Sequence, residues 1–236
     1  MFTMETTVLV IGGGITGAGI ARDLALRDVD VTVIEKDTFA SGTSGSSHGL
    51  LHSGARYANS DKDGAKECII ENNIIRDIAG NCIEDTGGLF VKLDSDDDAY
   101  FNEKIESCEE IGIPVEVYDG EKAREIEPEL TEDVEKIATV PDAAIYPSRL
   151  VAATLESAVQ NGASVYSESP VEDITVSDGS ITSVHVGGSL NTDIKPTYVI
   201  NATGAWAEEC AALAGVTVKM NPTKGVMVSV EYPELS

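Results

Sequence analysis

The residues best suited to chemistry lie together in the segment HGLLHSGARY, residues 48–57. It contains two of the chain's three histidines, His48 and His52, followed by Arg56 and Tyr57. A neutral imidazole can accept a proton near neutral pH. An arginine guanidinium keeps its charge and can bind two phosphate oxygens at once. The segment therefore has the groups needed to bind an anionic substrate and to remove a proton from it.

A glycine-rich turn lies between a predicted buried strand at residues 6–11 and a predicted helix at 15–27. Gly12, Gly14 and Gly17 fit the pattern G-x-G-x-x-G at this turn. Such glycines permit a tight bend, close approach to a pyrophosphate, and close packing of helix on strand. The helix N-terminus adds free N–H groups and a positive dipole. The pattern predicts a dinucleotide site, and an ordinary β–α–β turn is the alternative.

A second predicted strand, at residues 30–36, ends in Glu35 and Lys36. Glu35 follows Gly17 by 18 residues, and a carboxylate at this point can accept hydrogen bonds from a ribose diol. Helical periodicity places six apolar side chains of the intervening helix on its inward face: Ile15, Ala18, Ile20, Ala21, Leu24 and Ala25. The chain therefore begins as part of a parallel sheet.

Two further segments favour FAD over a nicotinamide cofactor. Residues 41–49, SGTSGSSHG, form a second loop of glycines and hydroxyl groups after the acidic strand. Residues 199–207, VINATGAWA, bring small side chains to a tight turn after a buried strand, although an ordinary strand-to-helix turn is the alternative. The predicted cofactor contacts beyond the first glycine turn are Glu35, Lys36, Thr43, Ser44, Ser47, His48, Gly49, Val171, Ala202, Thr203, Gly204 and Trp206.

The rest of the chain alternates between helical and strand patterns, which predicts a mixed α/β fold. Predicted helices cover residues 61–80, 99–111, a segment ending near Pro128, 148–162 with Ser148 as its cap, and a segment from Ala205. Predicted strands cover residues 88–93, 114–118, 163–168, 171–177, 181–187, 197–204 and 224–236. The turn SDGS joins two of these strands as a hairpin, in which His185 is expected to be structural. Because no linker separates the patterns, we expect the domains to interleave.

Acidic residues dominate the composition. The 236 residues include 41 Asp and Glu against 16 Lys and Arg, a net charge of −25. Binding to nucleic acid or to anionic lipid needs basic surface, so the charge argues against both. Charge this far from zero destabilises a compact state unless salt screens it, which predicts adaptation to molar salt. A solvated acidic face in an ordinary soluble protein is the alternative.

The four cysteines are scattered and include no C-x-x-C pair. The sequence therefore predicts no zinc site, iron–sulfur cluster or disulfide framework, and no other metal site. It shows no signal peptide and no apolar run of transmembrane length. We expect the chain to be cytoplasmic, or peripheral to a membrane through a partner.

The sequence closely resembles FAD-dependent glycerol-3-phosphate dehydrogenase, most of all the catalytic A subunit of the anaerobic type. The resemblance rests on residues 9–36, on HGLLHSGARY and on INATGAWA at 200–207. It continues through 67–72, 87–91 and 140–150 and so covers nearly all of the chain. Together with the acidity, it indicates a haloarchaeal member.

This resemblance implies the fold of glycine and D-amino-acid oxidases. In that fold an FAD-binding, Rossmann-like β–α–β domain interleaves with a substrate domain built on an antiparallel sheet. The implied division assigns 1–80 and 146–220 to the FAD domain, and 81–145 and 221–236 to the substrate domain. Members of the family continue beyond the last predicted strand, which would otherwise leave an unpaired edge. We therefore expect the chain to be truncated at its C-terminus.

The resemblance also implies a reaction, the oxidation of sn-glycerol 3-phosphate to dihydroxyacetone phosphate. A hydride passes from C2 to flavin N5, and electrons pass toward quinone. Arg56 and Tyr57 match the family's substrate-contacting pair, and His52 is either the base or a side chain that packs on the flavin. The family's partners are an iron–sulfur subunit, which anchors the complex to the inner face of the cell membrane, and a second flavoprotein subunit.

Two other functions remain open. A 2-hydroxy-acid oxidase of the L-2-hydroxyglutarate type has the same fold and a similar H-S-G stretch, but such enzymes place tyrosine in the run that holds Arg56 here. The chain could also be a non-catalytic FAD-binding fragment. The remaining basic residues of a substrate pocket would distinguish an enzyme from that fragment.

Overall fold

The computed structural model describes residues 3–228, which form two compact units. In this range unit 1 comprises residues 3–47 and 146–225, and unit 2 comprises 48–145 and 226–228. Unit 2 is thus inserted into the sequence of unit 1. The predicted interleaved α/β fold is confirmed.

The changes between units fall at 47/48, 145/146 and 225/226. The division expected at 145/146 coincides with one of them. The division expected at 80/81 lies inside unit 2, because the helix over 62–79 packs on residues 55–57 and on the helix over 98–111 of that unit. The cofactor loop expected at 41–49 crosses from unit 1 into unit 2.

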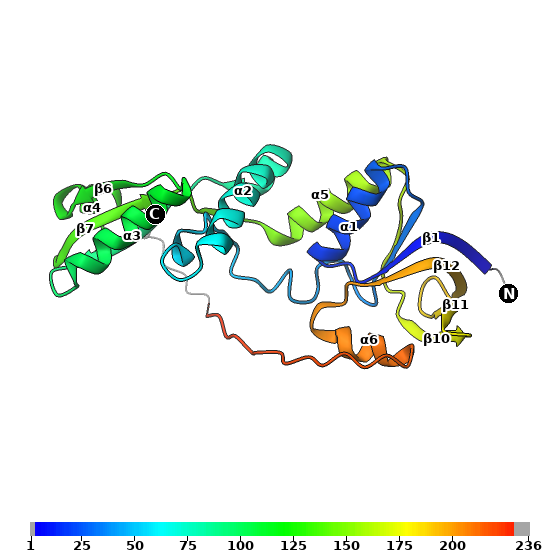
Figure 1. Cartoon of the computed structure of the whole chain (residues 1–236). Coiled ribbons are helices and arrows are strands. Elements are labelled where there is room, and N and C mark those ends of the chain that lie inside the picture. The colour runs from blue at the N-terminus through cyan, green and yellow to red at the C-terminus, as the bar shows by residue number, and fades with distance from the viewer. Residues whose placement is uncertain (1–2, 229–236) are drawn as a thin grey trace. The chain divides into compact units, whose positions relative to one another are not determined.

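Unit 1 is built on a six-stranded, mostly parallel sheet (Figure 1). Its strands are β1 (Thr3–Ile11), β2 (Val31–Ile34), β9 (Ser164–Tyr166), β10 (Val171–Ser177), β11 (Ser180–Val186) and β12 (Thr192–Asn201). Their order is β10-β11-β12-β1-β2-β9, with the antiparallel hairpin β10–β11 at one edge. Its helices are α1 (Ile15–Leu26), α5 (Pro147–Gln160), the 3₁₀ turn η3 (Gly204–Trp206) and α6 (Ala207–Leu213).

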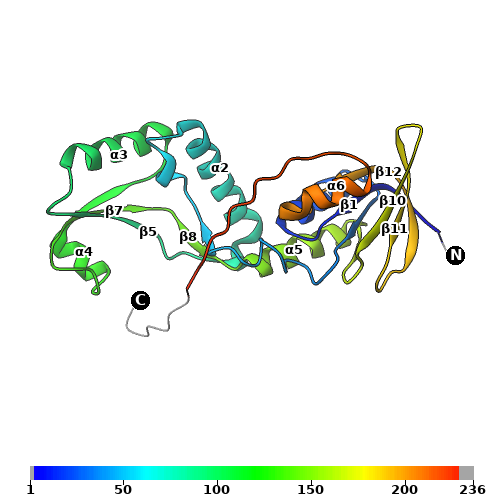
Figure 2. The same ribbon diagram turned by 90° about the horizontal axis from the view of Figure 1, so that it is seen from below.

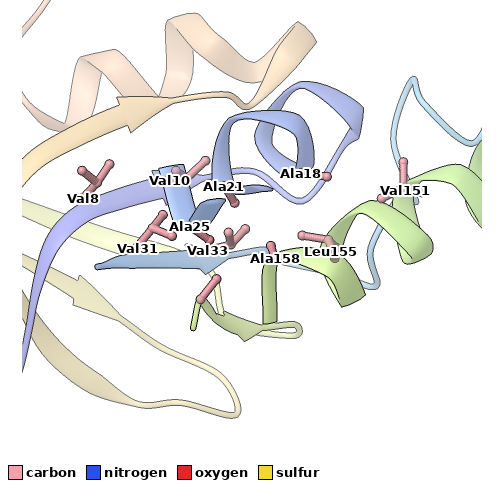
Figure 3. Close-up of a cluster of buried hydrophobic side chains, with 12 residues drawn as sticks. Val8, Val10, Ala18, Ala21, Ala25, Val31, Val33, Val151, Leu155 and Ala158 are labelled. Carbon is pink, nitrogen blue, oxygen red and sulfur yellow. The ribbon is translucent and has the colours of Figure 1, made fainter. Parts of the chain in front are cut away.

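The core of unit 1 has two layers, one on each face of the sheet. Because successive side chains of a strand point to opposite faces, Val8 and Val10 of β1 pack with α1 and α5 (Figure 3). Leu9 and Ile11 of β1 pack on the other face, in a cluster that includes Cys210 of α6. Each fully buried aliphatic side chain contributes about 1.5–3 kcal/mol.

Helix α1 contacts the sheet through small side chains. The buried alanines of its inward face are Ala18, Ala21 and Ala25, and Ile20 and Leu24 pack beside them. The prediction for Ile15 was wrong, since its side chain is 40% exposed. Ile15 lies on the same side as Ala18 but is the first residue of the helix, where fewer neighbours cover it.

Unit 2 contains two small antiparallel sheets, β3-β8-β4 and β5-β7-β6. Their strands are β3 (Leu50–Leu51), β4 (Ile83–Glu84), β5 (Gly88–Leu93), β6 (Glu116–Asp119), β7 (Val134–Val140) and β8 (Ala143–Ile145). The helices are η1 (Ala55–Tyr57), α2 (Lys62–Ala79), η2 (Gly80–Cys82), α3 (Asp98–Ile111) and α4 (Gly120–Ile126). Helices α3 and α4 lie on opposite sides of the sheet β5-β7-β6 (Figure 2). The predicted antiparallel character of this part is confirmed.

Several predicted boundaries differ from the structure. Helix α5 begins at Pro147 with Tyr146 as its N-cap, so Ser148 does not cap it; proline suits a first helical position because its missing N–H would be unpaired there anyway. Strand β12 begins at Thr192, because its first residues pair with β11 and β1. Residues 224–228 form no strand, since no neighbouring strand pairs with them, and the rest of the strand predicted at 224–236 lies outside the described residues.

Candidate active site

The glycine turn after β1 has a geometry that only glycine satisfies. Gly12 has a φ of +113°, and a Cβ placed on it would lie 2.5 Å from the carbonyl oxygen of Ala202. A Cβ on Gly17 would overlap with the carbonyl oxygen of Gly12. Gly12 therefore allows the end of β12 to lie close to the turn. Gly17 allows α1 to lie close to the end of β1.

The N-terminus of α1 is open at its cap position. Gly14 is the N-cap and supplies no side chain to bond the first turn. The backbone N–H of Ile15 instead donates to Ser44 Oγ at 2.9 Å. The predicted loop residue Ser44 therefore lies at the helix end, where free N–H groups and the helix dipole favour an anion such as a pyrophosphate.

Glu35 follows β2 and is held by backbone groups. Its carboxylate accepts hydrogen bonds from the N–H of Gly13 at 2.7 Å and of Asp37 at 3.0 Å. A carboxylate has about four acceptor sites, so capacity for a ribose diol remains. The N–H of Ser169 donates to the Glu35 carbonyl. Val171, the first residue of β10, follows Ser169 by two positions and so begins close to Glu35.

The turn after β12 contacts the loop that follows β2. The N–H of Ala202 donates to the Ile11 carbonyl at 2.8 Å, and Thr203 Oγ1 donates to Asn201 Oδ1 at 2.7 Å. The Lys36 ammonium lies 4.2 Å from the centroid of the Trp206 ring. Gly204, with a φ of +59°, starts the turn that carries this ring.

Trp206 also contacts the loop at Gly42, where a Cβ would lie 3.1 Å from the indole ring. Thr43 and Ser47, on the same loop, are exposed. A narrow glycine turn, an open helix N-terminus and a fixed carboxylate together suit a dinucleotide. The residues of unit 1 therefore fit FAD.

In unit 2, His52 lies opposite Asp142. Strands β3 and β8 pair Leu50 with Ala144 and Leu51 with Ala143, so His52 and Asp142 are the next pair in register. His52 Nδ1 lies 3.4 Å from Asp142 Oδ2. The other carboxylate oxygen, Oδ1, accepts from the N–H and the hydroxyl of Ser53, both at 2.6 Å.

A buried amide holds the backbone on both sides of this pair. Asn72 of α2 is only 1% exposed, and its Nδ2 donates to the carbonyls of Leu51 at 3.4 Å and Pro141 at 3.2 Å. Those two residues directly precede His52 and Asp142. Arg76 in turn donates to Asn72 Oδ1 at 2.7 Å, to the Pro141 carbonyl at 3.0 Å, and to Asp85.

His48 lies beside His52 in this unit. The two rings meet edge to face, with centroids 5.2 Å apart. The N–H of Leu50 donates to His48 Nδ1 at 3.2 Å, so a neutral His48 carries its proton on Nε2. Gly49, with a φ of +67°, turns the chain into β3, and its carbonyl accepts from the Ile145 N–H at 2.8 Å.

Arg56 and Tyr57 lie in the single turn η1. Gly54 opens it with a φ of +90°, and a Cβ there would overlap with the Ala65 carbonyl of α2, so this approach requires glycine. Both side chains are exposed, Tyr57 by 41%. Within the described residues the Arg56 guanidinium has no ion pair.

A second cation, Lys104, bonds the backbone of Arg56. Lys104 of α3 is 7% exposed, and its Nζ donates to the Arg56 carbonyl at 3.1 Å. Burial lowers the pKa of Lys104, and the nearby Arg56 charge lowers it further, against the effect of Cys108. Two positive groups in so acidic a chain give this turn an attractive potential for an anion.

The structure adds residues for which the sequence predicted no role. They are Asp142, Asn72, Arg76 and Lys104. Asn72 and Asp142 lie within segments that carry the family resemblance, at 67–72 and 140–150. Their function depends on a strand pairing between residues some 90 positions apart, which local periodicity does not reveal. Helical periodicity gave no reason to single out Lys104.

Other candidate groups have structural roles. His185 in β11 bonds Asp193 of β12 at 2.8 Å, as expected of a structural histidine. The four cysteines are free, and burial raises the pKa of the Cys108 and Cys210 thiols. The part of the chain described here contains no cluster of residues arranged to hold a metal ion. None of its helices combines the length and apolar character needed to span a membrane.

Comparison with known proteins gives related flavoenzymes. The chain is 51% identical over 233 residues to the A1 subunit of anaerobic glycerol-3-phosphate dehydrogenase from Haloferax volcanii, covering 94% of this chain and 40% of that protein. It is 39% identical over 233 residues to the A subunit of anaerobic glycerol-3-phosphate dehydrogenase from Escherichia coli, covering 98% and 43%. The chain thus spans about two fifths of the length of these relatives. The haloarchaeal relative agrees with the predicted adaptation to salt.

Solved structures and a family model also match the chain. The crystal structure of L-proline dehydrogenase from P. horikoshii superimposes with a TM-score of 0.79 at 27% identity, covering 93% of this chain and 58% of that one. The family model for FAD dependent oxidoreductases, DAO, matches residues 7–236. FAD is the cofactor of that family, and the turn at Gly12, the cap at Gly14 and the carboxylate of Glu35 suit it. The chain belongs to the DAO family of FAD-dependent oxidoreductases.

Proposed function

We propose that this chain carries the FAD-binding and substrate-oxidising residues of a glycerol-3-phosphate dehydrogenase. The observation that carries the proposal is the exposed Arg56 guanidinium, which has no ion pair within the described residues and follows His52 by four positions. A guanidinium four residues after a histidine suits a substrate that carries a phosphate and loses a hydroxyl proton. The names of the relatives in Haloferax volcanii and Escherichia coli support the same substrate.

The reaction removes a hydride from C2 and a proton from the C2 hydroxyl of sn-glycerol 3-phosphate. Arg56 holds the phosphate through two parallel N–H···O bonds, and the Tyr57 hydroxyl is available to the same substrate. His52 accepts the hydroxyl proton. Bound FAD supplies the hydride acceptor at its N5 atom. The products are dihydroxyacetone phosphate and reduced cofactor.

Electrons must then leave the reduced cofactor. We propose that they pass toward quinone through two partner chains, a second flavoprotein and an iron–sulfur protein that anchors the complex to the inner face of the cell membrane. Both relatives are named as single subunits of their enzyme, which supports an assembly of several chains.

Arg56→Lys tests the substrate assignment. Lysine keeps the charge but loses the bidentate geometry, worth about 1.5–3 kcal/mol for charge-assisted bonds. We expect the glycerol 3-phosphate concentration that gives half-maximal flavin reduction to rise about 10–100-fold, with FAD content unchanged. Stopped-flow absorbance under anaerobic conditions measures this concentration.

Arg27→Lys is the matched control, because Arg27 lies on the surface and pairs with Asp23 at 2.9 Å. It should leave substrate dependence unchanged. If both variants require the same glycerol 3-phosphate concentration for half-maximal flavin reduction, Arg56 does not bind the phosphate. Flavin reduction by 2-hydroxyglutarate in place of glycerol 3-phosphate would assign the chain to the 2-hydroxy-acid oxidases.

A further inference from the structure

We infer that Asp142 is a positioning residue that fixes the protonation form of His52, so that Nε2 is free to accept the substrate proton. This inference rests on the proposed function and names a residue outside the substrate-binding pair. It begins from the register of β3 and β8, which brings His52 and Asp142 opposite each other. Their side chains are both largely covered, at 23% and 20% exposure.

The hydrogen bonds of Asp142 determine which ring nitrogen carries the proton. An ionised carboxylate only accepts. Oδ1 is bonded by both donors of Ser53, a residue with no exposed surface, so Oδ2 is the oxygen left for His52 Nδ1 at 3.4 Å. A neutral His52 bonded in this way carries its proton on Nδ1. Its Nε2 lone pair, which has no partner among the described residues, is then available as a base.

Asn72 makes the arrangement rigid. It donates to the carbonyls of Leu51 and Pro141, the residues directly before His52 and Asp142. Arg76 holds the Asn72 oxygen and bonds the Pro141 carbonyl as well. One buried amide of α2 thus bonds the backbone directly before the histidine and directly before the carboxylate, which limits relative movement of the pair.

Asp142→Asn should reverse the proton position. The N–H and hydroxyl of Ser53 both donate, so the asparagine oxygen must keep facing them. Its NH₂ group then faces His52 Nδ1 and donates to it, and the His52 proton moves to Nε2. The side chain keeps its size and its bonds to Ser53, so folding and FAD content should be retained.

The test is nitrogen-15 NMR of imidazole-labelled histidine in the FAD-loaded protein, together with the rate of flavin reduction by glycerol 3-phosphate. The chain has three histidines, so His48→Gln and His185→Gln assign the signals. We expect Nδ1 protonation of His52 in the parent protein and Nε2 protonation in Asp142→Asn. The rate of flavin reduction should fall about 10²–10⁴-fold, the usual contribution of a general base.

Asp193→Asn is the matched control, since Asp193 bonds His185 Nδ1 in unit 1. It should change the His185 signal and leave the His52 signal and the rate unaltered. Nε2 protonation of His52 in the parent protein overturns the inference, even if Asp142→Asn does not fold. An unchanged rate despite a reversed proton position also overturns it. If glycerol 3-phosphate fails to reduce the parent flavin, the proposed function fails, while the NMR measurement still decides the role of Asp142.

Discussion

At the scale of single residues, the glycines show most directly how the sequence determines the site. The turn at Gly12, Gly14 and Gly17 could be recognised from spacing alone, because the first two glycines lie between a strand and a helix and the third lies in the first turn of that helix. The structure gives the reason at Gly12 and Gly17, where a carbonyl oxygen occupies the space of a Cβ. Asp142 could not be assigned, because its role requires a pairing partner far along the chain.

Gly17→Ala and Gly19→Ala form a matched pair in α1. A methyl group at Gly17 overlaps with the Gly12 carbonyl, whereas nothing lies within 4 Å of a Cβ at Gly19. We expect Gly17→Ala to lower the free energy of unfolding by about 1–3 kcal/mol and to release FAD. Gly19→Ala should raise it by up to about 1 kcal/mol. Urea unfolding and flavin absorbance measure both; equal effects of the two changes would contradict the close helix–strand approach.

At the scale of elements, long and regular patterns were predictable and short paired strands were not. The β1–α1–β2 unit has a β-branched run, a glycine turn and a periodic helix. Strands β3 and β4 have two residues each, and β8 has three, so their sequences contain almost no periodicity. They exist because neighbouring strands bond them, which is a property of the folded chain.

Lys92 of β5 provides a prediction at this scale. It is 2% exposed and pairs with Glu135 of β7 and with Asp98 of α3 at 3.4 Å. The side-chain bond with Lys92 lowers the pKa of Glu135, and the Lys92 charge lowers that of Asp98. Because both pKa values are lowered by folding, the stability from these ion pairs is present above about pH 4.5 and is lost as pH falls through the lowered values.

Lys92→Met should therefore reduce the unfolding temperature most above about pH 4.5, and the difference from the parent protein should shrink at lower pH. Thermal melts at constant salt between about pH 3 and 6 measure this. Lys66→Met is the control, because Lys66 is exposed and has no ion pair in the described part of the chain. A difference for Lys92→Met that does not vary with pH would show that the ion pairs are not its cause.

At the scale of the whole molecule, the interleaving of the two units was predictable, but the changes at 47/48 and 225/226 were expected at 80/81 and 220/221. Two kinds of pattern alternate along the sequence without a linker, which indicates interleaving. The change at 47/48 lies inside a polar, glycine-rich loop whose composition is similar on both sides. Which unit such a loop joins depends on its contacts in the folded chain, which local composition does not reveal.

The net charge of −25 governs behaviour at this scale. Repulsion among the carboxylates should destabilise the folded chain when salt no longer screens it, since the Debye length grows from about 3 Å at 1 M to about 10 Å at 0.1 M. We expect the unfolding temperature to fall continuously as KCl is reduced over this range. Sucrose of equal osmolality should raise it less than KCl does, because sucrose favours the compact state without screening charge. Full retention of structure at low salt would contradict adaptation to molar salt.

The most direct test of the central claim is the visible absorption spectrum of the purified protein in molar salt, recorded anaerobically before and after substrate is added. The account predicts a flavin band that bleaches with glycerol 3-phosphate and not with 2-hydroxyglutarate. A flavin band unchanged by glycerol 3-phosphate would contradict the proposed substrate, and a protein that holds no flavin would contradict the cofactor site built from Gly12, Gly17 and Glu35.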